Sequence, residues 1–450
     1  MTTTRVPGPA GSPLLGSLLD LKRDNLNTYL RAQREYGDVV RLTAGPPGMR
    51  AEYYAVFSAE GVQRVLATDA AVFRKDTPFY QEVREGFGDG LLTSQDDVYL
   101  RQRRLLQPLF TRRRVNTYAA TITEEAATAA ARWRDAPGGV VDVVEESTRF
   151  TLRTVARILF GSDVDEAIEV VRRAFPVLAG HVLGRSFSPV KTPRGWPTPA
   201  NRRAEEARRA LYEVCDRIIA ERDARGAAGE RDDLLGLLRA AGEDGDHLDA
   251  AEVRDQVLIF LLAGHETTAT SVGFALHLLA RHPEVQERAF AEVDTVLGGR
   301  PPGADDLDAL PYLTRVLKEA MRLYPAAPSV GRRSTAEVLI DGHRVPAGSN
   351  VLVSAWVTHR HPSYWKDPEV FDPDRFTPEA EAGRPRYAYF PFGGGPRACV
   401  GQQFSMLESV LGLAVVLQAY RLEAVDTEVP VSRGITLLAK GPVRCRLTAR

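Results

Sequence analysis

Hydrophobic and polar residues follow one another with helical spacing over most of this chain. From about residue 95 to residue 297, Ala, Leu, Arg and Glu dominate, and apolar positions recur at the three- and four-residue intervals of a helix face. The pattern breaks at residues 137–139 and 189–199, where Gly and Pro concentrate. Further helices are expected over residues 26–36, between Pro311 and Pro325, and over residues 403–420. The pattern therefore predicts a mainly α-helical protein.

Short runs of β-type residues stand outside these helical stretches. They occur at residues 39–42, 53–57, 337–340 and 350–356. Residues 357–401 form a long stretch rich in Pro, Gly, Arg and aromatic residues, and loops of that length in a compact domain usually carry function. Because no internal repeat and no linker interrupts the pattern, we expect a single domain, residues 1–450, with small β-sheets beside the helices.

The composition fits a compact globular protein, since 44% of the residues are hydrophobic and 26% are charged. Lys and Arg (58) balance Asp and Glu (59), and the formal net charge of -1 supplies no overall field for attracting nucleic acid or anionic lipid. The N-terminal segment is interrupted by Pro7, Pro9 and Pro13 and lacks the features of a signal peptide. We expect no nucleic-acid partner and no membrane anchor.

The most apolar internal stretch, residues 257–280, approaches the length of a membrane span but contains Glu266, two histidines and several hydroxyl groups. A buried central helix is therefore the preferred interpretation. The only cysteines, Cys215, Cys399 and Cys445, lie far apart and lack the paired spacings of zinc sites or disulfide frameworks. This cysteine usage favours a reducing, cytoplasmic setting.

One of these cysteines lies in a distinctive loop. Residues 392–401, FGGGPRACVG, place Cys399 in a glycine-rich segment directly before an apolar helix. Backbone amides at a helix start stabilise the thiolate that a soft metal needs. A lone cysteine would more often be a buried structural residue, but the whole pattern outweighs that interpretation. Cys215 and Cys445 lack this context and are expected to be packing residues.

The loop resembles the haem-binding loop of the cytochrome P450 family in composition and spacing, through Phe392, Gly395, Arg397, Cys399 and Gly401. The resemblance implies that Cys399 is the proximal ligand of haem b (iron protoporphyrin IX) and that these five residues bind the cofactor. Thiolate ligation favours cleavage of bound dioxygen. The family motifs extend over nearly the whole chain, which implies a triangular prism of helices with small β-sheets at one side.

A second signal interrupts the apolar central helix at residues 263–268, AGHETT, and Asp249 and Glu252 are expected to cap the start of this helix. Hydroxyl groups that bond back to the backbone favour a local helix distortion. A core helix tolerates a polar interruption, but a buried Glu is costly unless it is paired or functional. The resemblance implies that Glu266 and Thr267 are catalytic and relay protons during oxygen activation.

A third signal joins Glu319 and Arg322, spaced i,i+3 on one predicted helix, to Arg375 in the sequence PDRF. An isolated pair of this kind is a weak signal because exposed helical pairs are common. In this order along the chain, the residues resemble the buried ion network that supports the haem loop in the family. Their expected role is structural.

The basic helix around residues 99–110 supplies further candidates for cofactor binding. The resemblance implies that Tyr99 and Arg103 contact a haem propionate, although Tyr99 stands where Trp or His is commoner, and that Arg332 and Arg397 occupy the other propionate-binding positions. The remaining arginines are a solvated face or a positive patch for an acidic electron donor: Arg101, Arg104, Arg112, Arg113 and Arg114. A nucleic-acid patch is a rival that nothing else in the chain supports.

The resemblance also implies an apolar substrate pocket over the haem. Its expected lining residues are Leu92, Phe260, Ala263, Ala327, Val330 and Ile435, and residues 174–201 are expected to form a lid. Apolar walls suit a lipophilic small molecule, with terpenoid, polyketide and fatty acyl substrates all compatible.

The expected function is insertion of one oxygen atom from O2 into such a substrate by C–H hydroxylation or epoxidation in specialised metabolism. Electrons would come from a separate ferredoxin and an NAD(P)H-dependent ferredoxin reductase, because no dinucleotide or flavin motif is present. A monomer is expected. The alternatives are a haem-thiolate enzyme that uses peroxide or isomerises its substrate, a non-catalytic haem protein, and a haem-free helical binding protein.

Overall fold

The computed structural model describes residues 6–160, 165–188, 191–224, 234–239 and 246–450. Residues 189–190 of the predicted lid lie outside the described residues. The predicted class, mainly α with small β-sheets, is confirmed. The helices are α1 Leu18–Tyr36, α2 Ala59–Gln63, α3 Pro78–Phe87, α4 Asp96–Leu106, α5 Arg112–Asn116, α6 Ala119–Trp133, α7 Val143–Phe160, α8 Asp165–Ser186, α9 Pro199–Ala224, α10 Leu234–Arg239, α11 Ala250–Arg281, α12 Pro283–Leu297, α13 Asp306–Ala309, α14 Pro311–Leu323, α15 Ala355–Thr358, α16 Pro378–Ala382 and α17 Gln402–Ala419.

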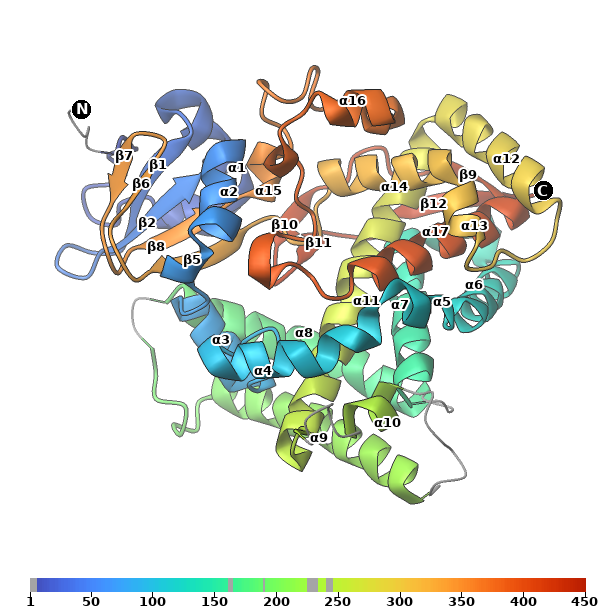
Figure 1. Ribbon diagram of the computed structural model, residues 1–450, viewed down its shortest axis with the longest axis horizontal. Coiled ribbons are helices and arrows are strands. Elements are labelled where there is room, and N and C mark those ends of the chain that lie inside the picture. The colour runs from blue at the N-terminus through green and yellow to red at the C-terminus, as the bar shows by residue number, and fades with distance from the viewer. Residues whose placement is uncertain (1–5, 161–164, 189–190, 225–233, 240–245) are drawn as a thin grey trace.

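The five-stranded sheet and the β6–β7 hairpin lie at one side of the molecule, whereas β9 and β12 lie at the opposite end (Figure 1). The largest has the strand order β1-β2-β8-β5-β3, in which β2 and β8 are parallel and the other pairs antiparallel. Two hairpins and a three-stranded sheet, order β4-β12-β9, complete the β-structure of the described residues. The strands are β1 Val39–Ala44, β2 Ala51–Val56, β3 Phe73–Arg74, β4 Val140–Asp142, β5 Val330–Ser334, β6 Val338–Ile340, β7 His343–Val345, β8 Asn350–Val353, β9 Tyr420–Ala424, β10 Val431–Arg433, β11 Leu437–Ala439 and β12 Arg444–Ala449.

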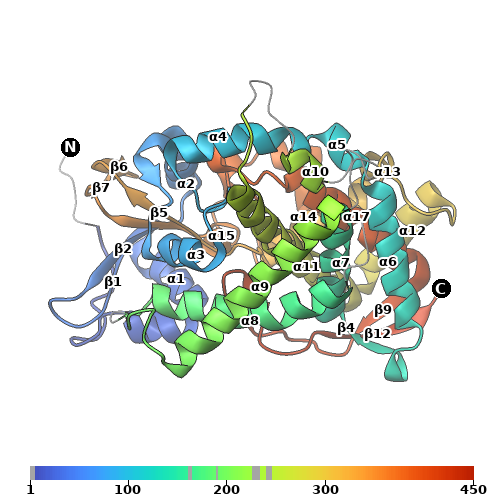
Figure 2. The ribbon, with the colours of Figure 1, turned by 90° about the horizontal axis from the view of Figure 1, so that it is seen from below.

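Helix α11 runs through the middle of the molecule, and α8 and α9 cross in front of it in Figure 2. It begins with the predicted capping box, in which the Asp249 carboxylate accepts from the Glu252 amide and the Glu252 carboxylate accepts from the Asp249 amide. Among the described residues it is the one helix apolar and long enough to cross a membrane, but 78% of its apolar window is buried inside the protein. The packing supports the interpretation of a core helix.

Several predicted boundaries differ from the structure. Helix α1 begins at Leu18, well before the predicted residue 26. Asp24 leaves the helical conformation (φ -161°, ψ 85°), and this kink interrupts the helical spacing of the apolar residues, so the first turns were not recognised in the sequence. The predicted strand over residues 350–356 ends at Val353, where Ser354 caps the short helix α15. Strand β4 interrupts the stretch predicted to be helical. The helices predicted after Pro311 and over residues 403–420 are confirmed as α14 and α17.

Candidate active site

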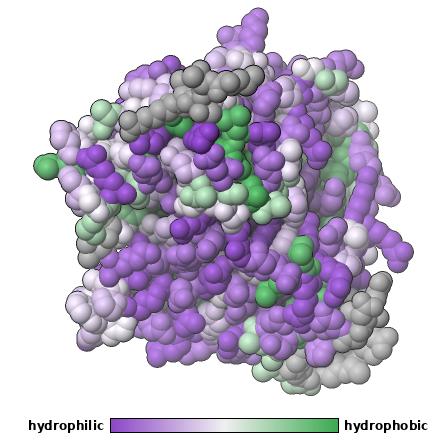
Figure 3. All heavy atoms as spheres, turned by 60° about the vertical axis from the view of Figure 1, so that its left-hand side comes forward, coloured by the Kyte–Doolittle hydropathy of each residue, from purple (hydrophilic) through white to green (hydrophobic). Residues whose placement is uncertain are grey.

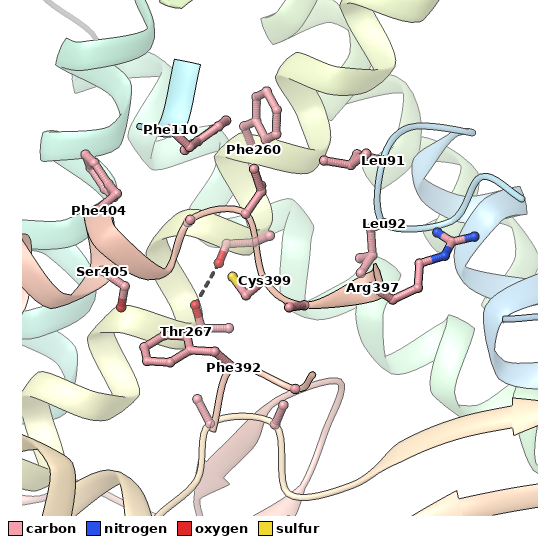
Figure 4. Close-up of a pocket in the computed structure, with 18 of the residues that line it drawn as sticks. Leu91, Leu92, Phe110, Phe260, Thr267, Phe392, Arg397, Cys399, Phe404 and Ser405 are labelled. Carbon is pink, nitrogen blue, oxygen red and sulfur yellow. Dashed lines mark hydrogen bonds between the residues drawn. The ribbon is translucent and has the colours of Figure 1, made fainter. Parts of the chain in front are cut away.

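A cavity of about 350 Å³ lies between α11 and the segment of residues 390–405 that carries the cysteine loop. Figure 4 shows Cys399 facing Thr267 of α11, with Leu91, Leu92, Phe110 and Phe260 on the apolar side of the same space. Most residues predicted from the sequence line this cavity: Leu92, Tyr99, Arg103, Phe260, Ala263, Thr267, Ala327, Val330, Arg332, Phe392, Arg397, Cys399 and Gly401.

Three predicted residues do not line the cavity. Ile435, in the turn between β10 and β11, packs against the apolar cluster that contains Leu91 and Phe260 of the cavity lining, but it is not itself a lining residue. Glu266 lies one residue before Thr267 and near Thr436. Gly395 acts through the backbone, because its φ of +63° and the 2.0 Å that would separate an added Cβ from the Leu66 carbonyl oxygen exclude any other residue there.

The backbone of the cysteine loop is fixed by internal hydrogen bonds. The Cys399 amide donates to the Phe392 carbonyl (2.9 Å), and the Phe390 amide donates to Nε2 of the buried His359 (3.0 Å). The thiol itself is open to the cavity although protein atoms surround it closely. Burial raises the pKa of the Cys399 thiol, while a hydrogen bond from the Gly401 amide and the charges of Arg103 and Lys75 oppose that rise. The loop thus presents a sulfur ligand at the cavity wall.

The opposite wall is the polar stretch of α11. The Thr267 hydroxyl donates to the Ala263 carbonyl (2.8 Å), as the dashed line in Figure 4 marks, and the helix runs unbroken from Ala250 to Arg281. The back-bonding is therefore present, but the predicted helix distortion is not. Burial raises the pKa of Glu266 to about 7, against a smaller opposing effect of the Thr436 hydroxyl. Glu266 is therefore partly protonated at neutral pH.

Four cations gather beside the cysteine loop: Lys75, Arg103, Arg332 and Arg397. Within the described part of the chain, none of them forms an ion pair. Lys75 is buried, with Nζ donating to the Leu92 carbonyl (3.2 Å), and burial together with Arg332 and Arg397 holds its pKa well below the usual range. Burial also lowers the pKa of Arg397 to about 10. Concentrated positive charge of this kind requires an anion.

Hydrogen bonds and a ring contact hold the side chains of this cluster in place. The Arg397 guanidinium lies over the Tyr99 ring (3.4 Å to the ring centre) and donates to the Ser94 carbonyl (2.6 Å), while its other terminal nitrogen is buried without a partner. The Tyr99 hydroxyl donates to the Pro396 carbonyl (2.6 Å) and Arg103 donates to the Ala398 carbonyl (2.9 Å). Unpaired cations beside a cavity-facing thiol fit the two propionates and the iron of haem b.

Sequence reasoning missed Lys75, because a single Lys before a helix carries no signal until its burial is known. It also missed other residues that the fold brings to the cavity, among them Leu91, Phe110, Thr268, Phe404 and Ser405. The Thr268 hydroxyl donates to the Ser405 hydroxyl (3.2 Å) and so links α11 to α17. Phe404 and Ser405 follow the cysteine loop by one helical turn, and this position in the sequence could have identified them as cavity residues.

The predicted ion network lies away from the cavity, between α14 and the segment that leads to the cysteine loop. Glu319 and Arg322 are fully buried and form a two-pronged pair, with Nε and a terminal nitrogen of Arg322 donating to the two carboxylate oxygens (2.6 and 2.8 Å). Arg375 Nε lies 3.4 Å from Glu319. Arg322 also donates to the carbonyl oxygens of His359, Pro368 and Val370, and therefore ties down three points of that segment.

The predicted positive patch is largely neutralised. Arg101 pairs with Asp246 (2.9 Å) and Glu252 (2.6 Å), and Arg104 pairs with the same Asp246 (3.1 Å). Arg112 pairs with Asp308. The pairs of Arg101 and Arg104 connect the basic helix α4 to the start of α11, and the Arg112 pair connects α5 to α13. The structure therefore does not support these three arginines as an unpaired docking surface.

The family model "Cytochrome P450" matches residues 6–447. The chain is 35% identical over 445 residues to pentalenene oxygenase of Streptomyces avermitilis, covering 98% of this chain and 97% of that protein. It is 36% identical over 427 residues to cyclooctat-9-en-7-ol 5-monooxygenase of Streptomyces melanosporofaciens, covering 94% and 90%. Among solved structures, the haem domain of cytochrome P450DA superposes with a TM-score of 0.90 at 29% identity and covers 100% of this chain and 99% of that one.

Proposed function

Because the chain belongs to the cytochrome P450 family and is a haem-thiolate monooxygenase, we propose that it oxygenates a terpenoid in specialised metabolism. The proposed reaction inserts one oxygen atom of O2 by hydroxylation of a C–H bond or by epoxidation. The apolar cavity that faces Cys399 carries this proposal.

The lining of that cavity supports a hydrocarbon-rich substrate. Above the cysteine loop the wall is built from Leu91, Leu92, Phe110, Phe260 and Val330, and it leaves few polar groups to recognise a substituent. Both bacterial relatives carry names that assign oxygenation of a terpenoid, pentalenene in one and cyclooctat-9-en-7-ol in the other. Shape and apolar contact, with few hydrogen bonds, would then orient the substrate.

Haem b supplies the activation of dioxygen when bound. In this proposal the Cys399 thiolate is the iron ligand, and Gly395 lets the loop approach Leu66 closely enough to hold it. Arg103, Arg332 and Arg397, with Lys75, hold the propionates. Glu319, Arg322 and Arg375 keep the segment before the loop in position.

Protons for the reaction would pass through Glu266 and Thr267. A pKa of about 7 suits Glu266 to donate and regain a proton near neutral pH. Glu266 would pass the proton to the neighbouring Thr267 hydroxyl, which lines the cavity, or to an ordered water. The apolar wall excludes other water from the substrate.

The proposal extends to partners and location. Residues 1–450 would act as one cytoplasmic, monomeric domain without a membrane anchor or nucleic-acid partner, supplied with electrons by a separate ferredoxin and its NAD(P)H-dependent reductase.

The first experiment is the carbon monoxide difference spectrum of the dithionite-reduced protein, recorded for the wild type, for Cys399→Ala and for the control Cys215→Ala. Cys215 is buried in α9, remote from the cavity lining. We expect a Soret band strongly red-shifted from that of His-ligated haem, lost in Cys399→Ala and kept in Cys215→Ala. An unshifted band, or a shifted band that survives Cys399→Ala, would refute the assignment of the ligand.

The second experiment tests the substrate class. The wild type, a surrogate ferredoxin and its reductase are incubated with NADPH and either pentalenene or dodecanoate, and products are identified by mass spectrometry with ¹⁸O2. We expect the label in a product of the terpene. Oxygenation of dodecanoate alone would overturn the terpenoid proposal, and unlabelled products formed only with added peroxide would favour the peroxide-using alternative.

A further inference from the structure

The loop of residues 88–95, which joins α3 to α4, turns apolar side chains toward the inside of the protein. Connections between helices usually present polar groups to water, and the surface turned forward in Figure 3 is accordingly mostly hydrophilic, with hydrophobic atoms gathered in only a few places. Leu91 and Leu92 of this loop instead line the cysteine cavity (Figure 4). The position of the loop therefore helps to set the shape of the substrate space.

The backbone of this loop is held against α11 by Gln256. The Leu91 amide donates to Oε1 of Gln256 (3.0 Å). The two segments lie so close together that a Cβ added at Gly90 would come within 2.6 Å of Ile259. Glycine at this position allows the close approach, and the hydrogen bond then fixes Leu91 relative to α11.

Gln256 belongs to the face of α11 that forms the cavity wall. The residues three, four, seven and eleven positions further along are Ile259, Phe260, Ala263 and Thr267, and all four line the cavity. These spacings place the five residues on one side of a helix. Gln256 therefore continues the wall by one turn, but its side chain binds the loop and is not part of the cavity lining.

A second glutamine, Gln102 of α4, holds the same loop. Its Nε2 donates to the Asp89 carbonyl (3.1 Å). Gln102 lies three residues after Tyr99 and directly before Arg103, and both of these residues line the cavity beside the cysteine loop. The loop is therefore fixed between the helix that carries Thr267 and the helix that carries Arg103.

Each of these glutamines is fully buried and uses only one half of its amide group. The backbone partners assign the atoms, since the Leu91 amide requires an acceptor and the Asp89 carbonyl requires a donor. Among the described residues, Nε2 of Gln256 and Oε1 of Gln102 have no hydrogen-bond partner. Because burial of an unpaired polar group is costly, an apolar side chain would pack better at either position. The bond to the loop is thus the contact that these two side chains supply.

We propose that Gln256 and Gln102 are positioning residues that determine the specificity of the oxygenation. By holding the backbone of Asp89 and Leu91, they set where Leu91 and Leu92 stand in the cavity, and so which carbon atom of the substrate is presented for oxygenation. Both glutamines act through the two leucines. The inference rests on the proposed function for its substrate, but the geometry of the loop can be tested without that substrate.

Spectral titration of the haem-loaded protein with two iron ligands provides this test. Econazole carries bulky aromatic groups that must fit the apolar wall, whereas imidazole is small and needs only access to the iron. Gln256→Met replaces the amide by an apolar chain of similar length and removes the acceptor of the Leu91 amide. We expect Gln256→Met and Gln102→Met each to weaken econazole binding at least tenfold and to leave imidazole binding within about twofold of the wild type. Equal changes for both ligands, or no change, would overturn the proposal.

A conservative variant and a control accompany these substitutions. Gln256→Glu keeps an oxygen that accepts from the Leu91 amide and should bind econazole within about threefold of the wild type. Gln418→Met makes the same substitution as Gln256→Met at a half-buried glutamine outside the cavity lining, whose amide donates to the Arg300 carbonyl (3.0 Å), and should bind both ligands like the wild type. Econazole binding by Gln256→Glu as weak as that of Gln256→Met would overturn the role of the hydrogen bond.

The products of oxygenation supply a second measurement. With pentalenene, ¹⁸O2 and the surrogate ferredoxin system, Gln256→Met should change the ratio of positional isomers of the labelled product at least fivefold, whereas Gln418→Met should keep the wild-type ratio. Labelled products in an unchanged ratio would contradict the proposal. If the wild type forms no labelled product from pentalenene, the terpenoid proposal fails, and the econazole titration still decides the role of the two glutamines.

Discussion

The protein contains two clusters of buried charge that differ in one respect. Around Glu319, each charge has a partner within the chain. The carboxylate forms ion pairs with Arg322 and Arg375, and Arg322 also donates hydrogen bonds to three backbone carbonyls. Beside the cysteine loop, by contrast, the cations of Lys75, Arg332 and Arg397 meet one another and no described carboxylate.

This difference separates charges that hold the fold from charges that hold a ligand. A buried ion is costly unless a partner compensates it. The Glu319 network carries its own compensation and therefore belongs to folding. The cation cluster is compensated only when an anionic group enters, and haem b with its two propionates is the anion that the family brings. Substitutions in the two clusters should accordingly have different, and partly opposite, consequences.

The largest effect is expected for Glu319→Ala. The substitution strands Arg322, which is fully buried, and removing one partner of a buried pair costs roughly 3 to 5 kcal/mol of unfolding free energy. The matched control is Glu381→Ala, which breaks the partly exposed pair between Lys318 of α14 and Glu381 of α16 and should cost no more than about 1 kcal/mol. Urea unfolding followed by circular dichroism measures both. Equal effects of the two substitutions would contradict the assignment of the Glu319 network to folding.

Glu266 sharpens the comparison because it is a buried acid that, among the described residues, has no cationic partner. Its folded pKa of about 7 lies above the ordinary 4.5, so ionisation disfavours the folded state, and stability is lost as the pH rises from about 4.5 to 7. Glu266→Gln should therefore be more stable than the wild type at pH 9, by about 3 kcal/mol at most, and equally stable at pH 4. Urea midpoints at the two pH values provide the measurement.

The same substitution should lower the rate of oxygenation by about 100-fold, because a glutamine donates no exchangeable acid proton. Glu252→Gln, at the exposed capping box of the same helix, is the control and should leave the rate unchanged. A stability difference that persists unchanged from pH 4 to pH 9 would show that Glu266 does not titrate as the burial implies.

The cation cluster should respond with opposite signs in two measurements. Lys75→Met replaces a buried ammonium by an apolar chain of similar length and should stabilise the haem-free protein by about 1 kcal/mol. It also removes a partner of the propionates and should weaken haem binding about tenfold. Haem titration and urea unfolding of the apoprotein measure the two effects, with Lys366→Met at an exposed position as the control. If Lys75→Met lowers the stability of the apoprotein and leaves its haem affinity unchanged, Lys75 has a purely structural role.

The sequence predicted best what depends on spacing along the chain. The cysteine loop, in which Gly395 adopts a φ of +63°, is such a local feature, and so is the i,i+3 pair on α14. The helices that follow Pro311 and end before Pro325, or that start after the cysteine loop, are marked by their own first and last residues.

What depends on packing was less accessible. Lys75 became a candidate only when its burial beside Arg332 was known. The position of Glu266 near Thr436 is set by which face of α11 meets the turn after β10. The position of Ile435 beside the cluster of Leu91 and Phe260 depends on where that turn folds. The pairing of Arg101 and Arg104 was equally inaccessible, since Asp246 comes from a distant part of the chain.

The smallest effect is expected for Asp374→Asn. This residue tests whether burial or the number of ion-pair partners decides how much a charge stabilises the fold. Asp374 meets two arginines, Arg288 (2.9 and 3.0 Å) and Arg315 (3.1 Å), so by contact alone it resembles Glu319. Its side chain is 45% exposed, however, whereas that of Glu319 is fully buried, and water already compensates much of the charge. The substitution should cost less than about 1 kcal/mol, and the cost should shrink in 1 M salt, which leaves the effect of Glu319→Ala nearly unchanged. Urea unfolding at low and high salt distinguishes the two, and a salt-independent loss of several kcal/mol in Asp374→Asn would mean that the number of partners, rather than burial, decides which charges hold this fold.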